Sequence, residues 1–251
     1  MNNTIITNDI STATINHFTR FENIVNILKS KYFEPHYCLE NINHINWKKF
    51  LGVENIVRLA YPMVCFTDLP HDKWYLHKKK YGNCVITLTE EWKLRNNLIP
   101  VIYLTQNNTL ADSLLPICLR MAKMYCEEHP EKKGFENFIN MLLVFFKLYQ
   151  EDDKRYYDER EWRYVPWKGM DKLDLCLPED TYNIDNIRKK AQSKILLNKD
   201  NLLYFNFTDI VNIEVSTDNE KEQVTKLLMN IFDVNYQDAK SKVSLVKNSR
   251  D

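Results

Sequence analysis

DEREWRYVPW, the stretch at residues 158–167, places Glu159 and Glu161 in a Glu-x-Glu frame between a charged, helix-like run and an aromatic segment typical of a strand. One carboxylate of such a pair can stabilise an oxocarbenium-like sugar, and the other can orient or deprotonate an acceptor. The same pattern also fits an edge strand whose charges pair with neighbouring strands. The frame therefore indicates either glycosyl-transfer chemistry or structural ion pairs.

The formal charge of the 251 residues is balanced, with 34 Lys and Arg against 34 Asp and Glu. The net charge therefore gives no indication of nucleic-acid binding, although it would not detect a local basic groove. Lys78, Lys79 and Lys80 form the densest cationic run. That run is more typical of a solvated turn or helix end than of a phosphate grip.

The six cysteines form no Cys-x-x-Cys pair, and residues 1–11 lack the apolar region of a signal peptide. We therefore expect reduced thiols and a cytoplasmic protein. No apolar run approaches the roughly 20 residues that a membrane helix needs, so we expect no membrane partner.

The glycines and histidines argue against several kinds of site. Only four isolated glycines occur, so neither a dinucleotide fingerprint nor a phosphate loop can be built. His71 and His77 lie near two aspartates, but no zinc-ligand spacing is present and we expect no metal. Cys65 lies inside an apolar strand, where packing is a better explanation than catalysis.

Apolar spacing predicts an α+β protein. The expected strands are at 15–18, 63–66, 84–89, 101–104, 162–165, 202–207 and 210–215, and the expected helices are at 22–31, 51–59, 72–80, 90–95, 111–128, 135–149 and 220–231. Because strands lie near both ends with helices between them, we expect one domain at residues 15–239. Residues 1–14 are expected to be disordered or loosely packed, and residues 240–251 to form a C-terminal tail.

Two more segments combine strand ends with polar groups. Residues 16–20 read Asn-His-Phe-Thr-Arg before a helix, which could present His17 and backbone donors to a ligand or simply cap the helix. Residues 65–70 read Cys-Phe-Thr-Asp-Leu-Pro, which could deliver a hydroxyl and a carboxylate to a site or form an Asx turn with Phe66 in the core.

Together these segments resemble the AbiGi family of bacterial abortive-infection proteins over roughly residues 15–230. The resemblance rests on His17-Phe18-Thr19, residues 62–70, His77 with Tyr81-Gly82, residues 100–103 and residues 158–166. It implies phage defence from a locus of two or more genes, with a cognate toxin or antitoxin as partner.

The same segments resemble, more weakly, the NAD site of ADP-ribosyltransferases. That resemblance implies a single domain with a split, mostly antiparallel sheet and inserted helices, which holds NAD as substrate without a metal. Glu161 would contact the nicotinamide ribose, Glu159 would serve the acceptor, and either His17 or Arg20 would fill the first-strand role. The implied NAD contacts are His17, Phe18, Thr19, Arg20, Phe66, Thr67 and Tyr81.

Our leading hypothesis is an effector that transfers ADP-ribose from NAD to a protein side chain or to a base of RNA or DNA. Contacts to a nucleobase acceptor would come from Arg160, Trp162, Arg163 and Trp167. The alternative is a non-catalytic antitoxin or regulatory subunit, which predicts an exposed apolar helix face at 111–128 or 135–149. A third hypothesis is hydrolysis of NAD or a nucleotide, with Glu161 acting on water.

Overall fold

The computed structural model describes residues 13–42, 58–105, 109–129, 142–166, 168 and 176–246. The chain divides into two compact units, each made of separate chain segments. Unit 1 comprises residues 1–31, 66–96 and 205–251, and unit 2 comprises residues 32–65 and 97–204. Strand β4 (Arg58–Thr67) begins in unit 2 and ends in unit 1.

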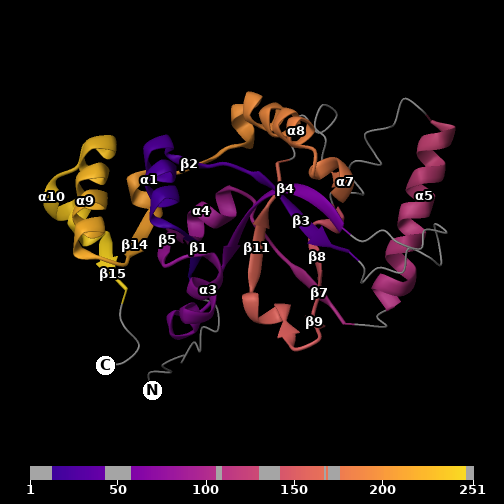
Figure 1. Cartoon of the computed structure of the whole chain (residues 1–251), viewed down its shortest axis with the longest axis horizontal. Coiled ribbons are helices and arrows are strands. Elements are labelled where there is room, and N and C mark those ends of the chain that lie inside the picture. The colour runs from indigo at the N-terminus through magenta and orange to yellow at the C-terminus, as the bar shows by residue number, and fades with distance from the viewer. Residues whose placement is uncertain are drawn as a thin grey trace, which may run out of the picture. The chain divides into compact units, whose positions relative to one another are not determined.

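Unit 1 contains a sheet with the strand order β15-β14-β5-β1 (Figure 1). Strands β1 (Thr14–Thr19) and β5 (Cys84–Thr89) pair antiparallel along their whole length. Strand β14 (Ile210–Val215) pairs antiparallel with β5, and β15 (Val243–Leu245) runs parallel to β14. Because β5 lies between two partners and is rich in β-branched residues, nearly all of its side chains are buried.

In unit 1, helix α9 (Asp218–Phe232) packs against both α1 (Phe21–Ser30) and α10 (Tyr236–Ser241) (Figure 1). Helix α9 begins at a capping box, in which the Thr217 hydroxyl accepts the backbone N–H of Glu220 and the Glu220 carboxylate accepts that of Thr217. This exchange satisfies donors that the first helical turn leaves without partners.

Helix α3 (Trp74–Tyr81) follows a 3₁₀ turn at His71–Lys73 and turns its buried face towards β1. The ring of Trp74 meets that of Phe18 edge to face at 5.4 Å, and its indole N–H donates to the Leu69 carbonyl at 2.9 Å. Aromatic edge contacts of this kind add to the area that they bury. Helix α4 (Glu90–Arg95) follows β5 directly.

Gly82 ends α3 at a point where the backbone of unit 1 is tightly packed. Its φ is +127°, and a Cβ atom there would lie 2.4 Å from the Thr19 carbonyl oxygen. Any other residue would therefore meet both a strained backbone and a clash.

In unit 2, β4 pairs antiparallel with β3 (His36–Asn41) and β12 (Leu177–Pro178), and β11 (Glu161–Tyr164) lies between β4 and β6 (Ile99–Pro100). Shorter pairs are β7 (Ile102–Leu104) with β8 (Phe146–Leu148), β9 (Gln150–Glu151) with β10 (Lys154–Arg155), and β2 (Tyr32–Phe33) with β13 (Leu203–Tyr204).

The helices described in unit 2 are α5 (Leu115–Glu128), which continues a π-helical turn at Leu110–Leu114, α7 (Glu179–Tyr182) and α8 (Asp185–Leu197). Helix α8 buries only Ala191 and Ile195. One hydrophobic cluster of unit 2 comprises Ile42, Tyr61, Met63, Leu143, Val144, Phe145 and Val165, and Cys65 packs against it.

The predicted α+β class and mostly antiparallel sheet are confirmed. Five predicted elements are confirmed within two or three residues at each end. They are the strands near 15–18, 84–89 and 210–215 and the helices near 22–31 and 220–231. The single-domain bounds at 15–239 stay a prediction.

Several element predictions were wrong. Residues 58 and 59 begin a strand, where the end of a helix was expected. The rest of that helix, and residues 135–141 of the helix expected at 135–149, lie outside the described residues. Residues 146–148 form β8, because they pair in parallel with β7, a partner that a local pattern does not reveal. Helix α8 was not predicted at all, since it buries so little apolar surface.

The chain ends also differ from expectation. The first strand already includes Thr14, inside the segment expected to be loosely packed. The expected tail from residue 240 contains the end of α10 and all of β15, which pairs with β14. In the expected strand at 202–207, only Leu203–Tyr204 is extended, and Phe207–Asp209 forms a 3₁₀ turn.

Candidate active site

The Glu-x-Glu frame lies in unit 2 where a 3₁₀ turn, Tyr156–Glu159, meets strand β11. Arg160 joins the two in a left-handed backbone conformation, with φ +43°. Both carboxylates are largely buried. The turn brings the side chains of Glu159 and Glu161 to the same amino group.

That amino group belongs to Lys147, in strand β8. Its Nζ donates to Glu159 Oε2 at 2.8 Å and to Glu161 Oε2 at 2.7 Å. Lys147 was not among the predicted site residues, because its segment was expected to be a helix. The period-3.6 pattern gave no signal that the side chain faces the Glu-x-Glu frame.

Arg163 holds the other side of Glu161. Its Nε and Nη2 donate to the two carboxylate oxygens at 2.7 and 3.1 Å, a bidentate pair. Nη2 also donates to Glu40 Oε2 at 2.9 Å, and Nη1 donates to the Val144 carbonyl. The side chain is 0% exposed, so Arg163, expected as a contact to a nucleobase acceptor, has no exposed surface for that role in this structure.

These contacts fix the protonation of the cluster. Burial alone would raise the pKa of Glu161, but Arg163 and Lys147 outweigh burial and hold that pKa well below its usual range. Burial alone would lower the pKa of Lys147, and the carboxylates of Glu161 and Glu40 raise it instead. At neutral pH the site therefore holds an ionised Glu161 beside a charged ammonium.

Tyr103 supports the start of β11 from β7. Its hydroxyl oxygen accepts the backbone N–H of Glu161 at 2.9 Å. The ring of Tyr157 lies across that of Tyr103 at 5.4 Å and stacks on Tyr149 at 5.1 Å. Burial raises the pKa of Tyr103, so its hydroxyl stays protonated and the backbone of Glu161 has a neutral, fixed partner.

The predicted NAD contacts lie in unit 1, around the end of β1. The ring of His17 lies 5.4 Å from that of Phe66, which in turn meets Trp92 at 5.4 Å. Thr19 Oγ1 accepts from the Asn23 side chain at 2.9 Å, and Thr67 Oγ1 accepts the backbone N–H of Leu69 at 3.2 Å. Short-range contacts therefore fix the side chains around this end of β1.

Not every predicted contact reaches the surface. Phe18 is 7% exposed and packs on Trp74 and His77, so its ring belongs to the core of unit 1. Phe66 is also buried, although it touches His17. Arg160 and Trp162 are half-buried in unit 2, and Trp167 lies outside the described residues.

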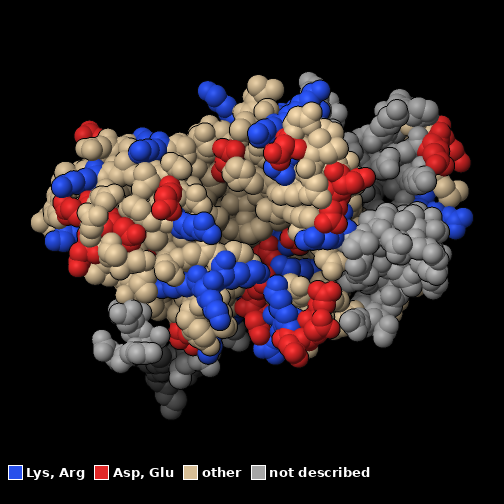
Figure 2. Space-filling view, in the orientation of Figure 1, with Lys and Arg blue, Asp and Glu red and all other residues tan. Residues whose placement is uncertain are grey.

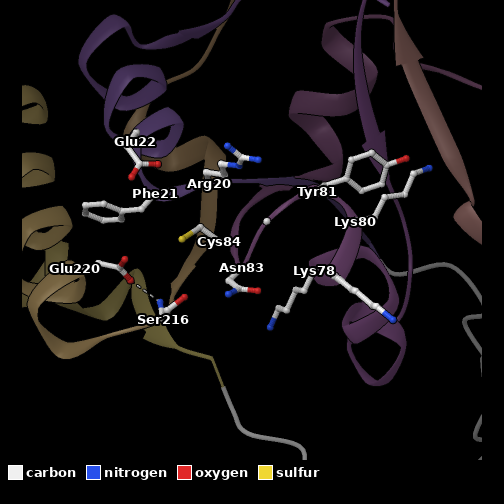
Figure 3. Close-up of a pocket in the computed structure, with 12 residues that line it drawn as sticks. Arg20, Phe21, Glu22, Lys78, Lys80, Tyr81, Asn83, Cys84, Ser216 and Glu220 are labelled. Carbon is white, nitrogen blue, oxygen red and sulfur yellow. Dashed lines mark hydrogen bonds between the residues drawn. The ribbon is translucent and has the colours of Figure 1, made fainter. Parts of the chain in front are cut away.

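Arg20 and Tyr81 line a hollow of about 470 Å³ in unit 1, shown in Figure 3. The start of α1, the end of α3 and the start of α9 contribute its walls (Figure 3). Its lining residues are Arg20, Phe21, Glu22, Lys78, Lys79, Lys80, Tyr81, Gly82, Asn83, Cys84, Ser216 and Glu220.

Across the described part of the chain, no group of three or more His, Cys, Asp or Glu side chains is placed to hold a metal ion. No helix within those same ranges is both long and apolar enough to cross a membrane.

Comparison with known proteins places the chain in a family. The model described as "Putative abortive phage resistance protein AbiGi, antitoxin" matches residues 31–216. The abortive phage resistance protein AbiGi of Lactococcus lactis subsp. cremoris is 28% identical over 229 residues, which cover 78% of this chain and 87% of that protein. No solved structure matches. Since the family model covers most of the chain, the chain belongs to the AbiGi family of abortive phage resistance proteins.

Proposed function

We propose that this abortive-infection protein transfers ADP-ribose from NAD to a macromolecule, with Glu161 and Glu159 as the catalytic pair. The observation that supports this is the convergence of both carboxylates on one ammonium, at 2.7 and 2.8 Å. Two carboxylates that bind one ammonium this closely can also stabilise the positive charge that develops on a ribose as its glycosidic bond breaks.

Glu161 stabilises that charge, because its low pKa keeps it ionised at neutral pH. The bond between the ribose C1′ and nicotinamide breaks, and nicotinamide leaves with the bonding electrons as a neutral molecule. The acceptor then forms a bond to C1′, and Glu159 takes the proton that the acceptor loses. In this scheme Lys147 turns away when the positively charged ribose arrives, since both compete for the same carboxylates.

The resemblance to ADP-ribosyltransferases assigns the NAD contacts to residues around the end of β1. Among them, His17 is half-buried beside Phe66 and would offer a polar contact, Arg20 would offer a charge for the diphosphate, and Thr19 is buried with its hydroxyl accepting from Asn23. Arg20 is exposed and lines the hollow in unit 1. The acceptor is a protein side chain or a nucleobase, with Arg160 and Trp162 as its contacts.

The test separates the two glutamates. Glu161→Gln should abolish both nicotinamide release and transfer of labelled ADP-ribose to host or phage protein and RNA. Glu159→Gln should abolish transfer and leave slow hydrolysis of NAD. Asp158→Asn, an exposed carboxylate next to the frame, is the matched control and should behave as wild type. Melting temperatures identify unfolded variants. No NAD turnover by a folded wild-type protein, or full activity of Glu161→Gln, would contradict the proposal.

The family description favours a second candidate, an antitoxin that binds a partner toxin. Helix α5 offers a surface for this role, because Leu114, Ile117, Met121 and Met124 recur at helical spacing and are all at least 42% exposed. Methionine-rich apolar surfaces adapt readily to a partner helix.

Coexpression with the neighbouring gene product tests this candidate. Met121→Lys/Met124→Lys should lose copurification of that product and its neutralisation. Ile184→Lys/Ile187→Lys introduces the same charges at exposed apolar positions around the start of α8 and should retain both. Equal loss in both double variants, or none in either, would contradict a partner site on α5.

A further inference from the structure

We infer that the exposed face of α3 binds single-stranded nucleic acid. We call this surface the α3 face and define it by Tyr75, Leu76, Lys79 and Lys80. It lies in unit 1, apart from the Glu-x-Glu frame in sequence, and the inference does not depend on transfer of ADP-ribose.

The helix geometry separates a buried face from the α3 face. Trp74 and His77 point inwards and pack on Phe18. Tyr75 is 58% exposed and Leu76 is 51% exposed. Packing within the described unit thus does not account for these two large side chains, and the rigid inner contacts present them on a fixed helix.

On the α3 face, two apolar side chains of one helical turn are followed by two lysines of the next turn. Tyr75 and Lys79 are four residues apart, as are Leu76 and Lys80, so each pair lies on one side of the helix about 6 Å apart along its axis. A base can stack on the tyrosine ring while the adjacent lysine neutralises a phosphate. The two pairs lie side by side and together form a short binding surface for a single strand.

The electrostatic surroundings favour an anion. The nearest carboxylate before this face, that of Asp72, pairs with Lys73 at 3.2 Å, and no Asp or Glu occurs from residue 73 to residue 89. Lys78 is occupied by the buried carboxylate of Glu214, which leaves Lys79 and Lys80 as the exposed charges of the run. In Figure 2, Lys and Arg side chains gather over the position of α3.

The hollow in unit 1 adjoins the α3 face, because Lys79 and Lys80 line both. Arg20 adds one further cation, and Lys78 also lines the hollow but pairs with Glu214. The lining carboxylates are those of Glu22 and Glu220, and Glu220 accepts the backbone N–H groups of Ser216 and Thr217 at 2.8 and 3.0 Å. Figure 3 shows Lys80 beside Tyr81 at the opposite rim.

A single strand is the occupant that this chemistry favours. Exposed aromatic rings next to lysines suit unpaired bases, whose faces are available for stacking, whereas duplex bases are already stacked. Phosphate contacts from only two lysines predict weak binding that falls steeply with salt.

Fluorescence anisotropy with the full chain tests the inference, using labelled oligo(U), oligo(dT) and a duplex of the same length at about 50 and 200 mM salt. Wild type should bind both single strands more tightly than the duplex. Lys79→Gln/Lys80→Gln should weaken binding at least about tenfold and reduce the slope of log affinity against log salt by about 1.4. Tyr75→Ala should weaken binding about tenfold with the slope unchanged.

The matched control is Lys189→Gln/Lys190→Gln on α8, which removes the same charge from another exposed helix surface and should change affinity less than twofold. Vesicles containing phosphatidylserine test a lipid ligand. No binding of wild type to either single strand, an equal loss in the two double variants, or binding to vesicles alone would overturn the inference. Unchanged melting temperatures show that the variants are folded.

Discussion

The Nζ of Lys147 lies 2.7 Å from Oε2 of Glu161, in a region where both side chains are at least 86% removed from solvent. This contact joins β8 to the start of β11. It also places the positive charge of one residue between two carboxylates, since Glu159 shares the same ammonium. A buried pair of this kind is costly to break, because the remaining charge stays buried without its partner.

We expect Lys147→Met to lower the free energy of unfolding by about 3 kcal/mol, because it leaves two buried carboxylates short of a partner. Urea denaturation followed by circular dichroism measures the change. Lys154→Met is the control: Lys154 also approaches Glu159, at 3.9 Å, but it is 51% exposed. The control should change stability by less than about 1 kcal/mol. Equal effects of the two variants would contradict a special role for Lys147.

The low pKa of Glu161 makes stability depend on pH in acid. Burial alone would raise this pKa, but Arg163 and Lys147 bring it far below the ordinary value of 4.5. The folded state therefore binds fewer protons than the unfolded chain in this range, and stability is present above about pH 4.5 and lost as the pH falls below it.

Glu161→Gln removes this titration. We expect the plot of unfolding free energy against pH to fall less steeply below pH 4.5 in the variant than in the wild type. Urea unfolding at a series of acid pH values measures both slopes. Identical slopes would show that Glu161 has the same pKa in the folded and unfolded states.

Arg163 and Glu161 should behave as a coupled pair. Arg163→Met alone leaves the buried carboxylate of Glu161 and the half-buried carboxylate of Glu40 beside an apolar side chain, and we expect a loss of about 3–5 kcal/mol. In the double variant Glu161→Gln/Arg163→Met, the loss should be about 1–3 kcal/mol smaller than the sum of the single losses.

A double-mutant cycle on Arg155 and Asp158 is the matched comparison for that pair. Their side chains are 52% and 45% exposed and 2.7 Å apart. Solvent and salt screen this pair, so its coupling should be much weaker than that of the buried pair. Additive losses at Arg163 and Glu161 would contradict the geometry described above.

Gly82→Ala should destabilise unit 1 by about 2–4 kcal/mol, because the residue has a positive φ and its new Cβ would meet the Thr19 carbonyl at 2.4 Å. Thermal unfolding by calorimetry measures the loss. Asn83→Ala, at the next and exposed position, should change stability little. A tolerated alanine at residue 82 would mean that the backbone of β1 can move away.

Much of the fold of unit 1 was predictable, because its elements have clear local patterns. The apolar spacing of α1 and the run of β-branched residues in β5 predict their own structures. Helix α8 lacks such a pattern, since only Ala191 and Ile195 are buried. Strand β8 has an apolar pattern that a helix would share, and only its distant partner β7 decides between them.

The candidate site was predictable only in the part that local sequence determines. Glu159 and Glu161 lie two residues apart, and their proximity follows from the chain itself. Lys147 and Tyr103 reach Glu161, and Glu40 reaches the neighbouring Arg163, through tertiary packing that nothing in the local sequence reveals. The burial of Arg163 was missed because an arginine in an alternating strand reads as exposed.

The discontinuous make-up of unit 1 has a consequence for synthesis on the ribosome. Strands β1 and β5 leave the ribosome before unit 2 is complete, but β14, which pairs with β5, belongs to residues 205–251 and emerges after all of unit 2. The nascent chain therefore carries β5 with an open edge until β14 has been made. A chain that stops near Tyr204 would contain a complete unit 2 and an aggregation-prone part of unit 1.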